Sequence, residues 1–179
     1  MSCKSDVKYN FGRASEYDEL VYGSARPGAV GQRCFNPEDK VTVAEVDEWS
    51  DHLASHGIRR VVSLLTPSEL ATYDGPPLHQ TLGRRFARAV NVDAKAPGAV
   101  ETLLAELREA EAAGDKVVVH CWGGGGRTGV ALAAWLVRRH GLEPEAAAAA
   151  VEKAAVAQGT SRRADVAQLR QFLGLGVAT

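Results

Sequence analysis

The sequence predicts an α/β domain of three layers, in which helices flank a mostly parallel central sheet. Two observations predict this class, and the length predicts that it is a single domain. Strand-like and helical segments alternate along the chain, and residues 58–65 and 116–119 are β-branched runs typical of strands buried on both faces. The length of 179 residues suits one hydrophobic core better than two. We expect an N-terminal arm at residues 1–18, which are polar and aperiodic, and a single domain at 19–179.

The first half of the domain is predicted to run from strand to helix to strand. Residues 20–22 form a short strand that ends at the turn-rich segment 23–28. Thr42 is a suitable N-cap for an amphipathic helix, whose apolar positions recur at helical spacing until Gly57. The strand at 58–65 follows, and Thr66 with Pro67 then starts a short helix.

The second half repeats the alternation. A strand at 86–92 leads into a loop at 93–98 and a helix at 99–113, which Gly114 closes. The strand at 116–119 is followed by helices at 130–140, at 143–158 with Pro144 in its first turn, and at 164–173. We find no internal repeat.

Composition and charge exclude several classes of protein. The net charge is −1, from 21 basic and 22 acidic residues, so no wide basic face for nucleic acid or membrane is indicated. With 24% charged residues and no long apolar run or signal-like N-terminus, we expect a soluble cytoplasmic protein. Three cysteines without metal-ligand spacing indicate neither a disulfide scaffold nor a metal site. The oligomeric state stays open.

One segment predicts chemistry: the strand at 116–119 runs into His120, Cys121, Trp122, four glycines at 123–126 and Arg127. Gly123, Gly124, Gly125 and Gly126 let the backbone turn tightly and direct N–H groups inward at the start of a helix, which favours a phosphate group. The same field favours a thiolate on Cys121, the predicted nucleophile. The planar fork of Arg127 suits two phosphate oxygens, and Trp122 shapes the pocket wall.

The segment HCWGGGGRTG at 120–129 resembles the active-site signature of the cysteine-dependent protein tyrosine and dual-specificity phosphatases. Upstream, LLTPSELATYDGPPL and the loop that begins at Asp93 resemble segments of kinase-associated-phosphatase-like enzymes, so the resemblance covers residues 20–173. It implies a phosphatase fold with the phosphate-binding loop between the last strand and a helix. It also implies a two-step reaction through a thiophosphoryl-enzyme on Cys121, without a metal or other cofactor.

The resemblance implies roles for three further residues. Asp93 lies 28 residues before Cys121 and is similar to the family's general acid, although an exposed helix-capping aspartate is the alternative. Thr128 resembles the hydroxyl residue that stabilises the departing thiolate, with a helix cap as the other role. His120 is expected to organise the loop by hydrogen bonding and not to act as the base.

Weaker signals concern residues outside this segment. Gln168 or Gln171 resembles a water-positioning glutamine of parts of the superfamily, yet helical surface glutamines are usually inert. Cys34 or Cys3 is a candidate for a protective disulfide with oxidised Cys121. A set of arginines is a candidate for flanking an anionic substrate, although most charge runs are solvated: Arg84, Arg85, Arg88, Arg162 and Arg163.

The function predicted from these residues is hydrolysis of phosphotyrosine, and with it phosphoserine or phosphothreonine, in a phosphorylated protein or peptide. A non-protein substrate is the first alternative: an inositol phosphate, a phosphoinositide or an RNA 5′ phosphate. Its weight is reduced because the loop interior holds Trp122 and glycines and no lysine. A phosphate-binding module without turnover, or a sulfur-transfer domain, is the alternative from another class.

Overall fold

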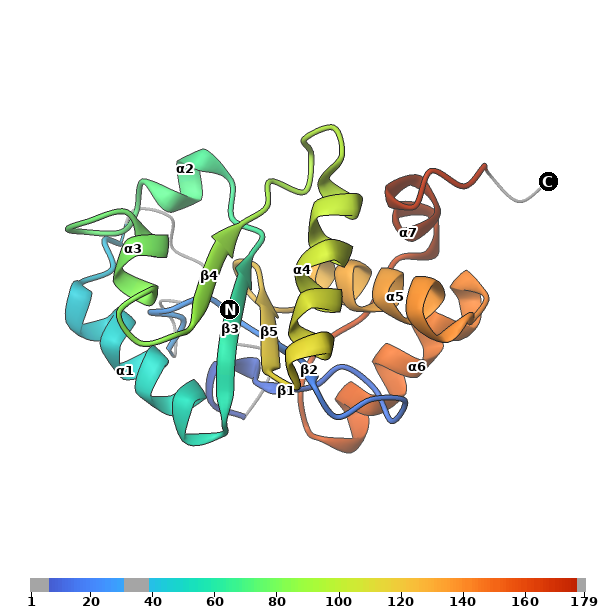
Figure 1. Ribbon diagram of the computed structural model, residues 1–179, viewed down its shortest axis with the longest axis horizontal. Helices are drawn as coiled ribbons and strands as arrows, with labels where there is room; N and C mark the ends of the chain where they lie inside the picture. The colour runs from blue at the N-terminus through green and yellow to red at the C-terminus, as the bar shows by residue number, and fades with distance from the viewer. Residues whose placement is uncertain (1–6, 31–38, 177–179) are drawn as a thin grey trace.

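A five-stranded sheet organises the computed structural model, which describes residues 7–30 and 39–176 (Figure 1). The strands are β1 (Gly12–Arg13), β2 (Val21–Ser24), β3 (Ile58–Ser63), β4 (Arg88–Asn91) and β5 (Lys116–His120), in the order β1-β2-β5-β3-β4. All neighbours are parallel except the edge pair β1 and β2. The α/β class with a mostly parallel sheet is thereby confirmed.

Strand β5 lies at the centre of the sheet, between β2 and β3, and is buried on both faces because a core cluster lies on each. Val118 lies opposite Tyr22 of β2 and Val61 of β3. Successive side chains of a strand point to opposite faces. Val117 and Val119 accordingly join one core cluster, whereas Val118 joins the other.

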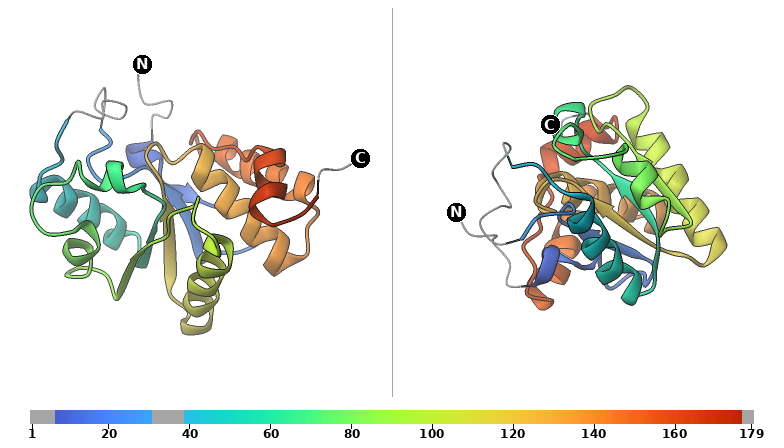
Figure 2. Two further views of the ribbon diagram at one scale, coloured as in Figure 1. Left: turned by 90° about the horizontal axis from the view of Figure 1, so that it is seen from above. Right: turned by 90° about the vertical axis from the view of Figure 1, so that its left-hand side faces the viewer.

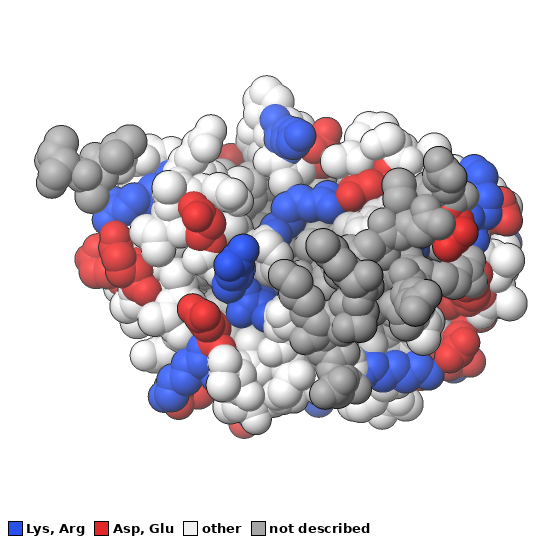
Figure 3. Space-filling model, turned by 180° about the vertical axis from the view of Figure 1, so that it is seen from behind, with Lys and Arg blue, Asp and Glu red and all other residues white. Residues whose placement is uncertain are grey.

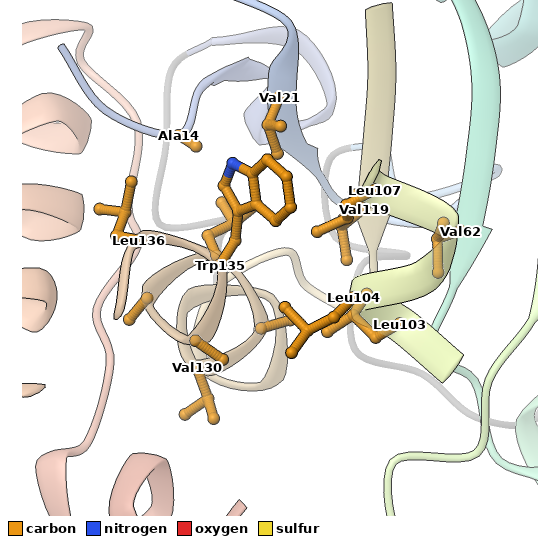
Figure 4. Packing of buried hydrophobic residues seen from close by; sticks show 14 of the residues in the cluster. Ala14, Val21, Val62, Leu103, Leu104, Leu107, Val119, Val130, Trp135 and Leu136 are labelled. Carbon is orange, nitrogen blue, oxygen red and sulfur yellow. The ribbon is translucent and has the colours of Figure 1, made fainter. Parts of the chain in front are cut away.

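Seven α-helices and one short 3-10 helix surround this sheet in the described residues. Their bounds are η1 (Lys8–Asn10), α1 (Val43–Ser55), α2 (Pro67–Leu70), α3 (Leu78–Leu82), α4 (Ala99–Ala113), α5 (Gly126–His140), α6 (Pro144–Ala157) and α7 (Val166–Phe172). Helices α1 and α3 cover one face, and α4 and α5 with α6 and α7 beyond them cover the other (Figures 1 and 2). Figure 4 shows Trp135 of α5 and Leu103 of α4 in the core of the second face.

Local capping chemistry sets the starts of two helices as the sequence predicts. Thr42 and Glu45 form a reciprocal capping box at α1, and Thr66 and Glu69 form the same box at α2. Gly114, with φ of 67°, ends α4 in the left-handed conformation.

Helix α5 begins at Gly126, four residues before the predicted start at 130. Its N-cap is Gly125, and no side chain caps it, so the usual polar start signal is absent. Arg127 and Thr128 therefore belong to the first turn of the helix and not to a loop ahead of it. Helix α3 was not predicted, because only five residues separate Pro77 from Gly83.

The N-terminal segment differs from the expected arm. Of residues 1–18, the structure describes 7–18, and these lie against the domain: Tyr9, Phe11 and Ala14 are buried, and β1 pairs with β2. Tyr9 and Phe11 belong to the core cluster that α1 also forms. The sequence pattern is aperiodic because this segment packs through single aromatic residues and a two-residue strand.

The surface carries charge of both signs. Figure 3 shows the face opposite to that of Figure 1, where coloured basic and acidic residues are interspersed. Across residues 7–30 and 39–176, no helix has the combined length and apolar character that a membrane crossing requires.

Candidate active site

The loops that follow the parallel strands meet at one edge of the sheet, at the carboxyl ends of the strands, and the left panel of Figure 2 looks toward this edge. Ligands of open α/β sheets bind outside this edge. The segment after β5, residues 121–126, lies at its centre and ends in the first residue of α5; it is called the cysteine loop below. It is joined to the loop after β2 by a hydrogen bond from Arg26 N to Trp122 O, and β5 is joined to the loop after β3 by one from Leu64 N to His120 O.

Three consecutive carbonyls of the cysteine loop are held by the surrounding scaffold. Arg26 N donates to Trp122 O at 3.2 Å, Asn10 Nδ2 to Gly123 O at 3.1 Å and Arg162 Nε to Gly124 O at 2.9 Å. In a trans peptide, the N–H of the next residue points away from the carbonyl.

The amides of residues 123, 124 and 125 therefore turn away from the scaffold. In the part of the chain that the structure describes, they donate to no other group. The first N–H groups of α5 add to this row of free donors, which can receive an oxyanion.

The loop glycines differ in how strictly the fold requires them. Gly124 has φ of +70°, and a Cβ there would lie 2.4 Å from the carbonyl carbon of Ser24. By contrast, a Cβ at Gly126 would meet nothing within 4 Å. Just beyond the loop, a Cβ on Gly129 would lie 2.0 Å from Arg163 O. The close approaches at Gly124 and Gly129 fix the loop and α5 against β2 and the segment before α7.

Cys121 directly follows β5 and is 3% exposed. It borders the core cluster between the sheet and helices α4 and α5. Among the described residues it is a free cysteine. Cys3 and Cys34, the candidates for a protective disulfide, lie outside the described residues.

The orientation of the Arg127 guanidinium is fixed by the carboxylate of Glu69 in α2. Its Nη1 and Nη2 donate to Glu69 Oε2 and Oε1 at 2.8 and 2.6 Å, and Nη1 also donates to Leu64 O at 2.9 Å. Burial alone would raise the pKa of Glu69, but the hydrogen bonds from Arg127 and Thr66 outweigh it and lower that pKa. Glu69 is therefore ionised near neutral pH. Its carboxylate orients the side chain of Arg127, which is still 33% exposed.

Asp93 lies in the loop after β4, close enough to Arg127 for the two charges to interact. The pKa of Arg127 is raised, mainly by the hydrogen bond with Glu69, and the charge of Asp93 contributes to the same shift. Asp93 Oδ1 accepts a hydrogen bond from Lys95 N at 3.0 Å. The alternative of a helix-capping aspartate is wrong, because Gly98 is the N-cap of α4 and no side chain caps that helix.

His120 is fully buried beneath the loop. Its Nδ1 lies 3.3 Å from Cys121 O, and its ring meets Trp49 edge-on at 5.3 Å between centroids. Burial lowers the pKa of His120 to about 4, so the ring is neutral near pH 7. Its Nε2 has no partner among the described residues.

Thr128 lies in the first turn of α5, with its hydroxyl buried and without a partner in the described part of the molecule. The alternative role as helix cap is wrong, because Gly125 occupies the N-cap. No described residue therefore engages the donor of this hydroxyl.

Trp122 forms one wall of the loop together with a residue that the sequence analysis missed. The Arg26 guanidinium carbon lies 3.7 Å from the centroid of the Trp122 ring, and Arg26 is 1% exposed. Such a cation–π contact fixes the ring from the β2 side.

Asn10 and Glu69 were also missed, and Arg162 was assigned to the wrong environment. Asn10 binds Ser161 through both ends of its amide and Gly123 through Nδ2. Arg162 is not on a solvated face, since it is 4% exposed and its Nε donates to Gly124 O of the cysteine loop. The capping box of α2 was the only signal for Glu69; for Asn10 the sequence holds none.

The family model described as "Swiss Army Knife protein, DSP-PTPase phosphatase domain" matches residues 41–173. The chain belongs to this family. The resemblance found in the sequence is confirmed, and the protein carries a phosphatase domain of the dual-specificity type. No curated protein matches the chain.

Solved structures share the fold of this DSP-PTPase domain at low identity. PTPMT1 in complex with PI(5)P is 17% identical with a TM-score of 0.65, over 92% of this chain and 94% of that one. Kinase associated phosphatase with a serine at its catalytic-site cysteine is 20% identical with a TM-score of 0.64, over 88% and 89%. TpbA from P. aeruginosa in complex with pTyr is 21% identical with a TM-score of 0.50, over 98% and 96%.

The remaining candidate residues form no hydrogen bond or ion pair with the cysteine loop of this DSP-PTPase domain within the described residues. Gln168 and Gln171 are exposed on α7, which packs against α5 and α6. Arg85 pairs with Asp51, and Arg88 binds Glu106 at the start of β4, at the opposite end of the sheet. No group of three or more side chains suited to a metal ion occurs in the residues described.

Proposed function

We propose that this DSP-PTPase domain hydrolyses phosphomonoesters through Cys121, with phosphotyrosine and phosphoserine or phosphothreonine of proteins as substrates. The observation that carries the proposal is the anchoring of three consecutive carbonyls at 122–124, which leaves the amides that follow them free to bind an oxyanion. Arg127, held by Glu69, supplies two more donors at the same place. Phosphoryl transfer depends mainly on such positioning and charge stabilisation.

In the proposed first step, the Cys121 thiolate attacks phosphorus while the bond between phosphorus and the leaving oxygen breaks. Asp93 in its acid form donates a proton to that oxygen. The amides of the cysteine loop and Arg127 stabilise the charge on the three equatorial oxygens. The product is a thiophosphoryl-enzyme and the dephosphorylated hydroxyl.

In the second step, water attacks phosphorus and the sulfur–phosphorus bond breaks. Asp93, now a carboxylate, takes a proton from the water. The Thr128 hydroxyl, which has no partner in the described structure, donates a hydrogen bond to the departing sulfur. Inorganic phosphate leaves and the thiolate is restored.

The absence of lysine and arginine at positions 122–126 supports a protein substrate. Positions 122–126 are one tryptophan and four glycines, so no loop cation is available for a second phosphate group. A Cβ at Gly126 would meet open space, which leaves the rim of the loop unobstructed for a peptide. PTPMT1 was solved with PI(5)P and TpbA with pTyr, so the fold accommodates both kinds of ligand.

The decisive experiment is hydrolysis of p-nitrophenyl phosphate in the presence of a chelator, by the wild type and by Cys121→Ser. We expect turnover by the wild type and none by the variant. Stabilisation of Cys121→Ser by vanadate, measured as a rise in melting temperature, controls for an intact loop. Equal activity of the two proteins, or none in either, rejects the proposal.

A substrate panel then separates the classes. Phosphotyrosine peptides, phosphothreonine peptides, inositol phosphates and vesicles containing phosphoinositide are compared by phosphate release. The proposal expects the highest kcat/KM on a phosphopeptide. A higher value on an inositol phosphate or a phosphoinositide assigns the site to a non-protein substrate.

The role of Asp93 has its own test. Asp93→Ala is expected to lower kcat by ~10²–10⁴-fold and to flatten the basic limb of the pH profile, because the leaving oxygen loses its proton donor. Asp74→Ala, in the turn before α3, is the matched control and keeps the wild-type rate. A wild-type rate in Asp93→Ala refutes the assignment.

A further inference from the structure

Arg162 lies behind the cysteine loop and is 4% exposed. Its Nε donates to Gly124 O at 2.9 Å and its Nη2 to Asn10 O at 2.6 Å. The backbone of β2 lies against the guanidinium, since a Cβ on Gly23 would be 2.5 Å from Arg162 Cζ. The side chain therefore fills the space between β2, the N-terminal segment and the loop.

No carboxylate neutralises this buried cation within residues 7–30 and 39–176. The hydrogen bonds of Arg162 run to two backbone carbonyls, and its Nη1 is buried without a partner there. A buried charge without an opposite charge is rare in proteins, because desolvation is costly. Desolvation lowers the pKa of Arg162 to about 10, and the charge of Cys121 acts in the opposite direction.

We propose that Arg162 is a positioning residue for the reaction, whose guanidinium is the counter-charge that holds Cys121 as a thiolate. The proposal rests on the proposed function in taking Cys121 as the nucleophile. The same side chain binds Gly124 O, so this residue both shapes the cysteine loop and places a positive charge behind it.

The other charged and titratable groups around the loop have other partners or are neutral, in contrast to Arg162. The charge of Cys121 acts on Arg127 as well, but Arg127 is already paired by the two-point hydrogen bond with Glu69, and the charge of Asp93 also acts on it. His120 is neutral near pH 7, and Arg26 stacks on Trp122. Arg162 is thus a buried cation directly behind the cysteine loop for which the described chain provides no carboxylate.

The test is the rate of Cys121 alkylation by iodoacetamide as a function of pH, which requires no turnover. Arg162→Gln keeps an amide donor for the carbonyls and removes the charge. We expect its alkylation midpoint to move to higher pH, with a rate about tenfold below wild type on the acidic side, because one charge interaction of roughly one pH unit is lost. Arg162→Lys, which keeps the charge, should recover most of the rate.

Arg163→Gln is the matched control, because it removes an exposed positive charge at the next position and should leave the alkylation profile unchanged. Folding of each variant is checked by circular dichroism and melting temperature. A folded Arg162→Gln protein with the wild-type pH profile overturns the proposal.

If Arg162→Gln does not fold, Gly23→Ala takes its place. The added methyl group displaces the guanidinium without removing the residue, and the same upward move of the midpoint is expected. An unchanged midpoint in that variant overturns the proposal too. Failure of phosphatase activity in the wild type is a separate result, since alkylation reports on the thiol alone.

Discussion

Two arginines meet the cysteine loop from opposite sides, and their surroundings differ. Arg127 on the open side is 33% exposed and is bound at two points by Glu69. Arg162 on the inner side is 4% exposed and binds only backbone carbonyls in the described chain. The comparison separates a side chain available to a substrate from one that is part of the scaffold.

This difference predicts how substitutions divide between activity and stability. A change on the open side should lower activity and leave folding almost intact, because solvent and Glu69 remain there. A change on the inner side should lower stability as well, because buried groups lose partners or meet new atoms.

The largest effect is expected for Arg127→Lys. Lysine keeps the charge but cannot present a planar fork, so kcat/KM should fall by ~10³-fold with little change in melting temperature. Steady-state kinetics with p-nitrophenyl phosphate measure this, with Arg163→Lys as the control. A loss of kcat/KM below tenfold would show that the planar guanidinium of Arg127 is unnecessary. It would also weaken the distinction between the Arg127 side and the Arg162 side of the loop.

The next effect concerns stability at the inner side. Gly124→Ala combines a positive φ with a clash against the backbone of Ser24, so the free energy of unfolding should fall by about 3 kcal/mol. Gly126→Ala is the matched control: its Cβ meets open space in the first turn of α5, so stability should change by less than about 0.5 kcal/mol. Urea unfolding compares the two, and equal losses would contradict the assigned geometry.

His120 should make the inner side sensitive to acid. Its pKa is lowered to about 4 by burial, so below the ordinary value near 6.5 the unfolded chain binds a proton that the folded chain excludes. The free energy of unfolding therefore falls as the pH falls, by about 2 kcal/mol between pH 7.5 and 5.

His120→Gln keeps a donor for Cys121 O and does not titrate, so it should lose this part of the pH dependence. Chemical unfolding of both proteins at the two pH values measures it. Identical pH dependence in the variant and the wild type would count against a buried neutral histidine.

The smallest effect is expected for Glu69→Gln on the open side. Arg127 would keep one hydrogen bond but lose its ionic partner, and a less well-oriented fork should lower kcat/KM by about tenfold. Glu45→Gln removes the equivalent carboxylate from the capping box of α1 and controls for the loss of the cap. If both variants lose activity equally, the effect comes from helix capping and not from Arg127.

The sequence allowed the contiguous part of the site to be predicted, because a strand, a glycine run and a helix are adjacent in the chain. The cap residues Thr42 and Thr66 and the end of α4 at Gly114 follow from local chemistry and were found correctly. The start of α5 was placed too late because glycine at its N-cap gives no polar signal.

The supports of the loop could not be predicted, because they come from remote segments. Asn10 is 113 residues from Gly123, and Arg162 is 38 residues from Gly124. Neither position carries a pattern that periodicity or capping would reveal. The pairing of Glu69 with Arg127 depends on how α2 turns after β3, and only the folded chain shows it.

The anchoring of Gly123 by Asn10 has a consequence for where the protein can be cut. The family match begins at residue 41, yet β2 and Asn10 precede it and hold β5 and the loop from one side. A fragment trimmed to that match would expose an edge of the central strand and release the loop. The smallest autonomous unit must therefore reach back at least to the turn that contains Asn10.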